Sequence, residues 1–323
     1  MGSKMSSKTF ALCSIMSLSA GMSIAEAPQV AVDIAPVHSL VARVMEGVGT
    51  PNLIIPAGAS PHEYNLRPSE AASLQNADVV FWVSASLTPW MKNAIETLAE
   101  DAVVTELFEV EGTLKLPFRQ GVLFEEHDDH EGHDDHEAHD DHDGHDDHDG
   151  HNHDGDDHHA WLSPDNAAVW LNAIAQTLSK VDPDNASQYY LNAAAGQKEL
   201  RELSTKINGI LAPFEGRNFI VFHDAFQYFE KAFDFYAAGA ISLSDARDPS
   251  PARIAKIQNR INEQNISCIL SEPQFNPNIV AAVASGSDVK MGILDPLGVG
   301  LELGETLYFQ TLHNLAKALS DCL

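Results

Sequence analysis

The sequence is poor in basic residues and cysteine, and beyond its N-terminus it has no long apolar run. Only 19 Lys and Arg stand against 47 Asp and Glu, which gives a formal net charge of −28. A nucleic acid or an anionic membrane would repel a protein of this charge, so neither is an expected partner. The sequence also lacks a Gly-x-x-x-x-Gly-Lys-Ser/Thr loop and a His-Glu-x-x-His pattern, two signatures of nucleotide and zinc-hydrolase sites. The acidity favours a cationic ligand.

The first 25 residues are typical of an export signal. Lys4 and Lys8 precede an apolar run at 10–24, and the small side chains of Ser23 and Ala25 suit cleavage after Ala25. A transmembrane anchor is the alternative, but this run is short and rich in serine and glycine. We therefore expect a signal peptide at 1–25 and a soluble, exported mature protein.

Two of the three cysteines, Cys268 and Cys322, would remain after removal of the signal. An oxidising compartment favours a disulfide between them, and two separate buried thiols are the alternative. In the chain-entropy model, closing a loop of this length contributes about 4 kcal/mol to the free energy of unfolding.

Short β-prone segments alternate with helical segments along most of the chain, a pattern that predicts βαβ units on parallel sheets. The segment 184–212 contains no proline, and Pro183 suits the first turn of a helix; one continuous helix here would span about 43 Å. We expect an α/β protein with two lobes, at 26–182 and 214–323, joined by this long helix within 183–213. The predicted strands are 29–35, 52–55, 79–83, 219–222, 267–270 and 289–294, and the predicted helices are 36–47, 69–76, 88–98, 166–180, 225–231, 251–264, 277–284 and 305–320.

Three histidines lie where open α/β sheets place their ligands, beyond the carboxyl ends of strands. His62 follows the second predicted strand, His223 follows the fourth, and His159 closes an acidic segment. Imidazole suits zinc, and three histidines leave a fourth position for water or a carboxylate. The alternative for each is a surface histidine or a hydrogen-bonded core histidine.

The acidic residues concentrate in one segment. Between Glu125 and His159 there are 17 Asp and Glu, no Lys or Arg, and 12 of the 16 histidines. We interpret 125–158 as a disordered loop, because Asp and Gly disfavour a helix and like charges repel. Its imidazoles and carboxylates would bind several zinc ions weakly, which suggests acquisition or buffering of zinc; a purely solubilising run is the alternative. The candidate ligands of this loop are His127, His130, His133, His136, His139, His142, His145, His148, His151, His153 and His158.

Five segments, spread in order over the mature chain, resemble the cluster A-I substrate-binding proteins of bacterial zinc and manganese ABC importers. The acidic histidine-rich insert and the two C-terminal cysteines point to the periplasmic zinc-binding members of that family. The five segments are 58–68 (GASPHEYNLRP), 159–164 (HAWLSP), 221–225 (VFHDA), 271–275 (SEPQF) and 294–298 (LDPLG).

The resemblance implies two (β/α)₄ lobes with mainly parallel sheets, a rigid linking helix, and Zn²⁺ held between the lobes by His62, His159 and His223. Some relatives place a glutamate directly before the first histidine, where this chain has a proline without a ligating side chain. Water is therefore our first expectation for the fourth ligand, Asp295 the second, and Glu63 the third.

Other side chains are candidates for supporting roles. Glu272 and Asp224 could accept a hydrogen bond from a ligand histidine, as such sites usually need, and capping a helix is the alternative for either. Glu63, if not a ligand, would hydrogen-bond nearby or stay solvated. His38, at a predicted helix start, is a weaker ligand candidate than a capping or surface residue, and His313 is interpreted as structural or exposed.

The leading hypothesis is a periplasmic carrier without enzymatic activity. It would capture Zn²⁺ with high affinity, as a monomer, and deliver it to the membrane permease of an ABC importer whose ATPase is a separate subunit. Because neutral imidazole is the ligating form, zinc affinity should fall below about pH 6.5. A zinc hydrolase with Glu63 as general base and a histidine-rich metal storage protein that uses only the acidic loop are the alternatives.

Overall fold

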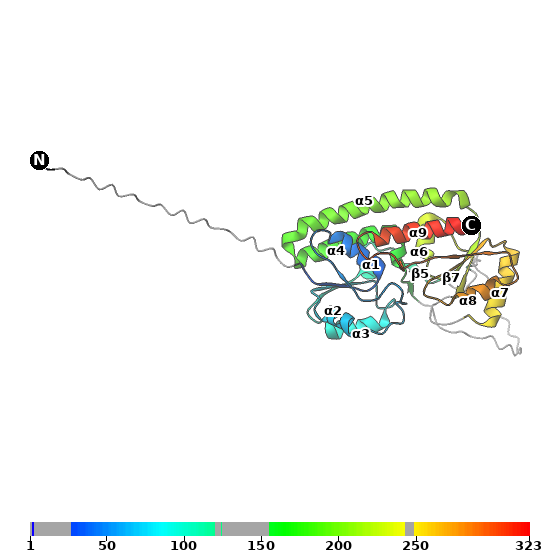
Figure 1. The fold of residues 1–323 in the computed structure, drawn as a ribbon, viewed down its shortest axis with the longest axis horizontal. Coiled ribbons are helices and arrows are strands. Elements are labelled where there is room, and N and C mark those ends of the chain that lie inside the picture. The colour runs from blue at the N-terminus through cyan, green and yellow to red at the C-terminus, as the bar shows by residue number, and fades with distance from the viewer. Residues whose placement is uncertain (1, 3–26, 120–123, 125–154, 243–248) are drawn as a thin grey trace, which may run out of the picture.

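The computed structural model describes residues 2, 27–119, 124, 155–242 and 249–323. It places two parallel β-sheets at the two ends of an elongated molecule, with helices running along one side between them (Figure 1). The expected signal peptide and the histidines from His127 to His153 lie outside the described residues. The α/β architecture with two lobes is confirmed.

The first lobe is built on a four-stranded sheet with strand order β2-β1-β3-β4 and parallel pairing throughout. All four residues of β3, Val-Val-Phe-Trp, are buried, as expected for a parallel sheet covered on both faces. The strands are β1 (Val30–Val32), β2 (Asn52–Leu53), β3 (Val79–Trp82) and β4 (Val103–Glu106), and the helices between them are α1 (Ala35–Val44), α2 (Pro68–Gln75) and α3 (Pro89–Leu98).

The second lobe repeats this plan with strand order β10-β9-β7-β8, again parallel. Side chains alternate across β7: Phe219 and Val221 belong to the large core shared with the first lobe, and Ile220 and Phe222 belong to a smaller outer core. By this alternation His223, the last residue of β7, lies on the face toward the shared core. The elements are β7 (Phe219–His223), α6 (Gln227–Phe233), β8 (Ala240–Ser242), α7 (Pro251–Glu263), β9 (Cys268–Ser271), α8 (Pro277–Ala284), β10 (Lys290–Ile293) and α9 (Leu307–Cys322).

Proline marks the start of many of these helices. A proline in the first turn lacks only an N–H that the helix cannot use, and its fixed φ suits helix entry. Ser163 adds a cap to α4 (Pro164–Val181), because its Oγ accepts a hydrogen bond from the Asn166 N–H. The helices that begin with proline are α2, α3, α4, α7 and α8.

The predicted long helix is α5 (Ala186–Leu211), which contacts α1, α4 and α9 and runs along the length of the molecule (Figure 1). Its 26 residues span about 39 Å. Pro183 does not begin this helix as predicted; it begins a separate 3₁₀ turn (Pro183–Asn185). Close packing against α4 explains Gly196 within the helix, because a Cβ there would lie 2.9 Å from Leu171 Cδ1.

Two connections fix the second lobe and the base of the acidic segment. Cys268 in β9 and Cys322 at the end of α9 form the predicted disulfide. The strands β5 (Leu116–Pro117) and β6 (Asp156–Asp157) pair antiparallel and form the β5–β6 hairpin. Because β6 occupies residues 156–157, the predicted loop ends earlier than residue 158.

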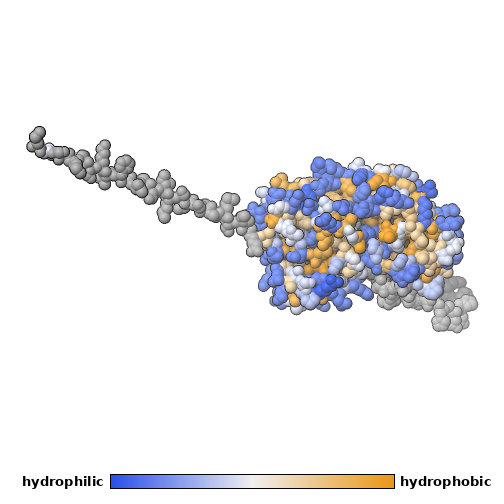
Figure 2. Space-filling view, viewed as in Figure 1, coloured by the Kyte–Doolittle hydropathy of each residue, from blue (hydrophilic) through white to orange (hydrophobic). Residues whose placement is uncertain are grey.

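Among the described residues there is no helix with the length and apolarity needed to cross a bilayer. In the space-filling view of Figure 2, hydrophilic residues cover most of the outer edge of the molecule.

Candidate metal centre

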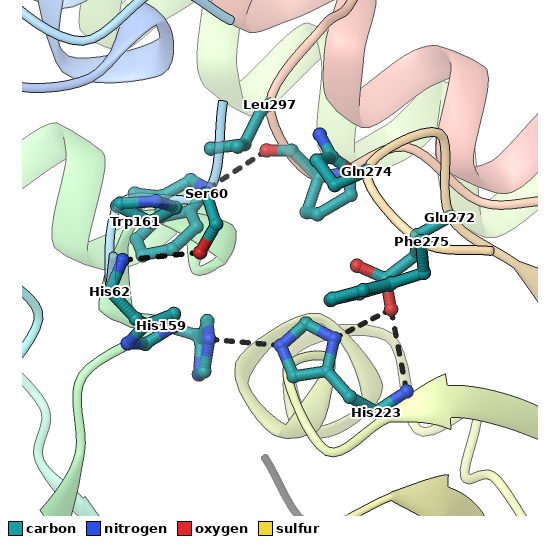
Figure 3. A pocket seen from close by; sticks show the side chains of 11 residues that line it. Ser60, His62, His159, Trp161, His223, Glu272, Gln274, Phe275 and Leu297 are labelled. Atoms are coloured by element: carbon teal, nitrogen blue, oxygen red, sulfur yellow. Dashed lines mark hydrogen bonds and ion pairs between the residues drawn. The ribbon is translucent and has the colours of Figure 1, made fainter. Parts of the chain in front are cut away.

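The structure brings the three candidate histidines together between the lobes (Figure 3). His62 comes from the loop between β2 and α2, His159 directly precedes the 3₁₀ turn Ala160–Leu162, and His223 ends β7. Their possible ligand atoms all lie within 4.8 Å of one another. His159 and His223 are buried, whereas His62 is partly exposed, so the site borders solvent on the His62 side.

The spacing of the imidazole nitrogens suits a tetrahedral metal ion. The Nε2 atoms of His159 and His223 are 3.3 Å apart, and a tetrahedron with zinc–nitrogen bonds of about 2.05 Å has an edge of about 3.3 Å. The ring of His62 lies 5.6 Å from that of His159, centroid to centroid. The donor set is therefore compatible with zinc without a large rearrangement of the two buried rings.

Each buried imidazole is held by a carboxylate on its other nitrogen. The Nδ1 of His159 lies 2.7 Å from Asp157 Oδ1, and the Nδ1 of His223 lies 2.6 Å from Glu272 Oε1. A carboxylate can only accept here, so each Nδ1 carries the proton and each Nε2 presents its lone pair to the centre. Burial raises the pKa of Asp157 to about 7, while the His159 N–H and the charge of Arg119 act in the opposite direction. A bound cation would further favour the ionised carboxylate.

The space at the centre is small. The cavity measures about 20 Å³, which is room for about one water molecule or ion. Trp161 and Phe275 supply aromatic walls, and the Trp161 Nε1–H donates to the carbonyl of Pro296 across the two lobes at 3.0 Å. The full lining consists of Ser60, Pro61, His62, His159, Trp161, His223, Glu272, Gln274, Phe275, Pro296 and Leu297.

The two carboxylates considered as a fourth ligand, Asp295 and Glu63, are not part of the histidine group. Among the described residues the group consists of the three histidines only. Asp295 Oδ1 instead accepts the N–H groups of Leu297 and Gly298, both at 3.0 Å, and Glu63 is exposed. The carboxylate of Asp224, predicted to support a ligand histidine, is held by Arg119 in an ion pair.

The remaining histidines that can be placed lie apart from this group. His38 is buried on α1 with its Nε2 3.0 Å from the carbonyl oxygen of Pro51, and His313 is a partly exposed residue of α9. His158, predicted as a ligand of the acidic loop, packs edge-on against the rings of Phe108 and Phe118.

Sequence reasoning missed three residues that shape the site. Asp157 precedes His159 by two positions, a usable signal, but it is one of 17 acids in its segment. Arg119 precedes that segment and pairs with Asp224 and Glu230, residues 105 and 111 positions away. Gln274 donates its Nε2–H to the carbonyl of Ala57 at 3.4 Å, and its Oε1 is buried without a hydrogen-bond partner in the described part of the chain. Such distant contacts leave no trace in local sequence.

Comparison with known proteins gives a consistent result. The sequence model of the family described as ZnuA, "Zinc-uptake complex component A periplasmic", matches residues 30–322. The chain is 44% identical over 314 residues to the high-affinity zinc uptake system protein ZnuA of Brucella abortus, with 94% of each chain covered. It is 43% identical over 306 residues to the protein of the same name from Paracoccus denitrificans, with 93% of each covered.

A solved structure has the same fold. A ZnuA deletion mutant with zinc bound superposes with a TM-score of 0.72 at 21% identity, covering 92% of this chain and 98% of the other.

Proposed function

This chain belongs to the ZnuA family of periplasmic zinc-uptake components, and from that premise we propose that it binds one Zn²⁺ through the Nε2 atoms of His62, His159 and His223. The protein is a periplasmic zinc-binding component of a zinc-uptake system. The observation that carries the proposed ligand set is the 3.3 Å separation of the two buried Nε2 atoms, with both Nδ1 atoms already engaged by carboxylates.

Water is the proposed fourth ligand. Pro61 offers no ligating side chain, and the Asp295 carboxylate is already occupied by backbone N–H groups. Gln274 lines the cavity with a buried Oε1 that meets no donor from the described residues. Its amide orientation follows from the Nε2–H donated to Ala57, so a zinc-bound water has an acceptor available in Gln274.

The cavity supports transport of an ion over catalysis. Three histidines and a water resemble hydrolytic zinc sites, but a cavity of about 20 Å³ holds an ion and little more. Glu63, the candidate base, is exposed. The protein is proposed to be a monomeric carrier without enzymatic activity, exported by the signal at 1–25, which hands Zn²⁺ to an ABC permease served by a separate ATPase.

The histidine-rich segment is proposed to collect and buffer zinc beside the cleft. Gly155, the described residue that follows it, adjoins β6, and the carbonyl of Gly155 accepts the N–H of Phe118, which follows β5, at 3.2 Å. The strand β6 contains Asp157, the partner of His159. Zinc released by the segment would therefore start close to the three histidines, which raises its effective concentration there.

Growth under zinc limitation tests the transport function. In cells that keep the cognate permease and ATPase, a chain carrying His223→Ala should fail to support growth with chelator, while His313→Ala, on α9, should support it. Replacement of 125–154 should slow growth only under severe limitation. Equal growth of the His223→Ala and wild-type strains at every zinc concentration would refute the carrier proposal.

A further inference from the structure

A buried ion cluster and a tyrosine connect the base of the acidic segment to the second lobe beside the metal centre. We infer that Arg119 and Tyr228 form a brace that sets the position of His223 relative to His159, and thereby the affinity for zinc. The inference rests on the proposed ligand set and assigns positioning roles to two residues that do not touch the ion.

Arg119 clamps two carboxylates of the second lobe. Its Nε donates to both oxygens of Asp224, at 3.0 and 3.2 Å, and its Nη2 also donates to Asp224 Oδ1. Its Nη1 and Nη2 donate to Glu230 at 2.7 and 3.3 Å. Asp224 and Glu230 are only 5% and 1% exposed, and the ring of Phe124 covers the guanidinium at 3.6 Å. The planar fork of arginine suits this arrangement of two carboxylates.

Tyr228 makes the second connection. Its hydroxyl accepts the N–H of Leu116 at 3.0 Å and donates to the carbonyl of Asp157 at 2.6 Å. It therefore joins α6 to both strands of the β5–β6 hairpin. The neighbouring Gln227 donates its Nε2–H to the carbonyl of Pro117 at 2.9 Å, so three residues of the hairpin are tied to one turn of α6.

Each connection ends on a residue that is close in sequence to a ligand histidine. Asp157 receives Tyr228 on its backbone and holds His159 through its side chain. Asp224, held by Arg119, directly follows His223 at the end of β7. A shift of α6 or of the hairpin would therefore move one buried imidazole relative to the other, and a displacement of a few tenths of an ångström changes the Nε2 separation of 3.3 Å relative to what zinc requires.

Positioning and electrostatics predict different effects of removing Arg119. If the two carboxylates stay ionised without it, they attract a nearby Zn²⁺ more strongly and binding becomes tighter; if they take up protons, the charge changes but the geometry of the ligands does not. If the brace sets the geometry, its loss weakens binding and also alters the arrangement of the ligands. Weaker binding together with an altered Co²⁺ spectrum therefore distinguishes the brace from a change in charge.

The experiment compares Arg119→Met, Arg119→Lys and Tyr228→Phe with a matched control, Arg43→Met. Arg43 also pairs with two carboxylates, Glu46 and Glu199, but it joins α1 to α5. Zinc affinity of the full chain would be measured by chelator competition, geometry by the visible absorption of the Co²⁺-loaded protein, and folding by the Tm of the metal-free protein. His223→Ala provides a test of the ligand set itself.

We expect Arg119→Met to weaken zinc binding about tenfold or more and to alter the Co²⁺ spectrum. Tyr228→Phe should shift both readouts in the same direction, and Arg119→Lys should fall between wild type and Arg119→Met because an ammonium cannot reproduce the fork. Arg43→Met should lower the Tm only. If Arg119→Met does not fold, the lysine and phenylalanine variants decide.

Unchanged or tighter zinc binding with an unaltered Co²⁺ spectrum in the folded Arg119 and Tyr228 variants would overturn the brace. In that case loss of binding in His223→Ala would leave the proposed ligand set standing. Tight binding in the His223→Ala protein would instead overturn the ligand set itself.

Discussion

Asp157 accepts two hydrogen bonds from His159: the backbone N–H lies 3.0 Å and the ring Nδ1 lies 2.7 Å from the same carboxylate oxygen. The aspartate is itself buried in the strand β6. Both the chain direction and the ring orientation of His159 are thus fixed by one side chain, which places its Nε2 toward His223. The metal centre depends on the hairpin as much as on the histidines.

Loss of the Asp157 charge should weaken zinc binding. Asparagine at this position keeps the size and one acceptor oxygen but stabilises the imidazole less, so Asp157→Asn should reduce affinity about 10- to 100-fold. Asp156→Asn, in the same strand with a partly exposed side chain, is the matched control and should bind as the wild type does. Chelator competition measures both, and equal affinities for the two variants would contradict the assigned role.

His38 should make the stability of the metal-free protein depend on pH. The side chain is 4% exposed, and burial lowers its pKa from 6.5, opposed by the carbonyl of Pro51. The unfolded chain therefore takes up the proton first, so the contribution of His38 is complete above about pH 6.5 and is lost as the pH falls toward the folded-state pKa.

Urea unfolding at about pH 7.5 and about pH 5.5 checks this. The loss of stability on acidification should be smaller in His38→Gln than in the wild type. Equal losses of stability in the wild type and His38→Gln would show that His38 does not contribute to the pH dependence of stability.

The disulfide should stabilise the second lobe without affecting zinc. Cys268 and Cys322 close a loop with a sequence separation of 54, which corresponds to about 4 kcal/mol in the chain-entropy model. Neither residue lines the metal cavity. The Cys268→Ser, Cys322→Ser double variant should unfold at lower urea concentration than the oxidised wild type yet bind zinc equally tightly when folded. An unchanged unfolding midpoint would show that the bridge contributes little.

The alternation of strands and helices was predictable from the sequence because buried parallel strands are short, apolar and separated by helices of regular period. The edge strands β4 and β8 were not predicted. In β4, Val103 and Val104 are 45% and 41% exposed. The sequence of this strand therefore does not show the continuous apolar run that marks a buried strand. Pro183 was assigned to the wrong helix because a 3₁₀ turn and the first turn of an α-helix make the same demands on a proline.

The meeting of the three histidines was predictable from strand ends and from family motifs. The residues that surround the three histidines were not predictable. Asp157 is hidden among repeated aspartates, and Arg119 acts on side chains more than 100 positions away, contacts that only the folded chain creates. Asp224 directly follows His223, but its pairing with the guanidinium of Arg119 could not be read from the sequence.

The most direct test of the account is a chelator-competition zinc titration of protein in which residues 125–154 are replaced by a short Gly-Ser linker. The replacement stops before Gly155 so that β6 and Asp157 stay in place. If His62, His159 and His223 hold the ion, this protein keeps one tight zinc site, and the site disappears when His223→Ala is added. Absence of a tight site in the protein without 125–154 would place zinc binding in the histidine-rich segment and contradict the three-histidine centre.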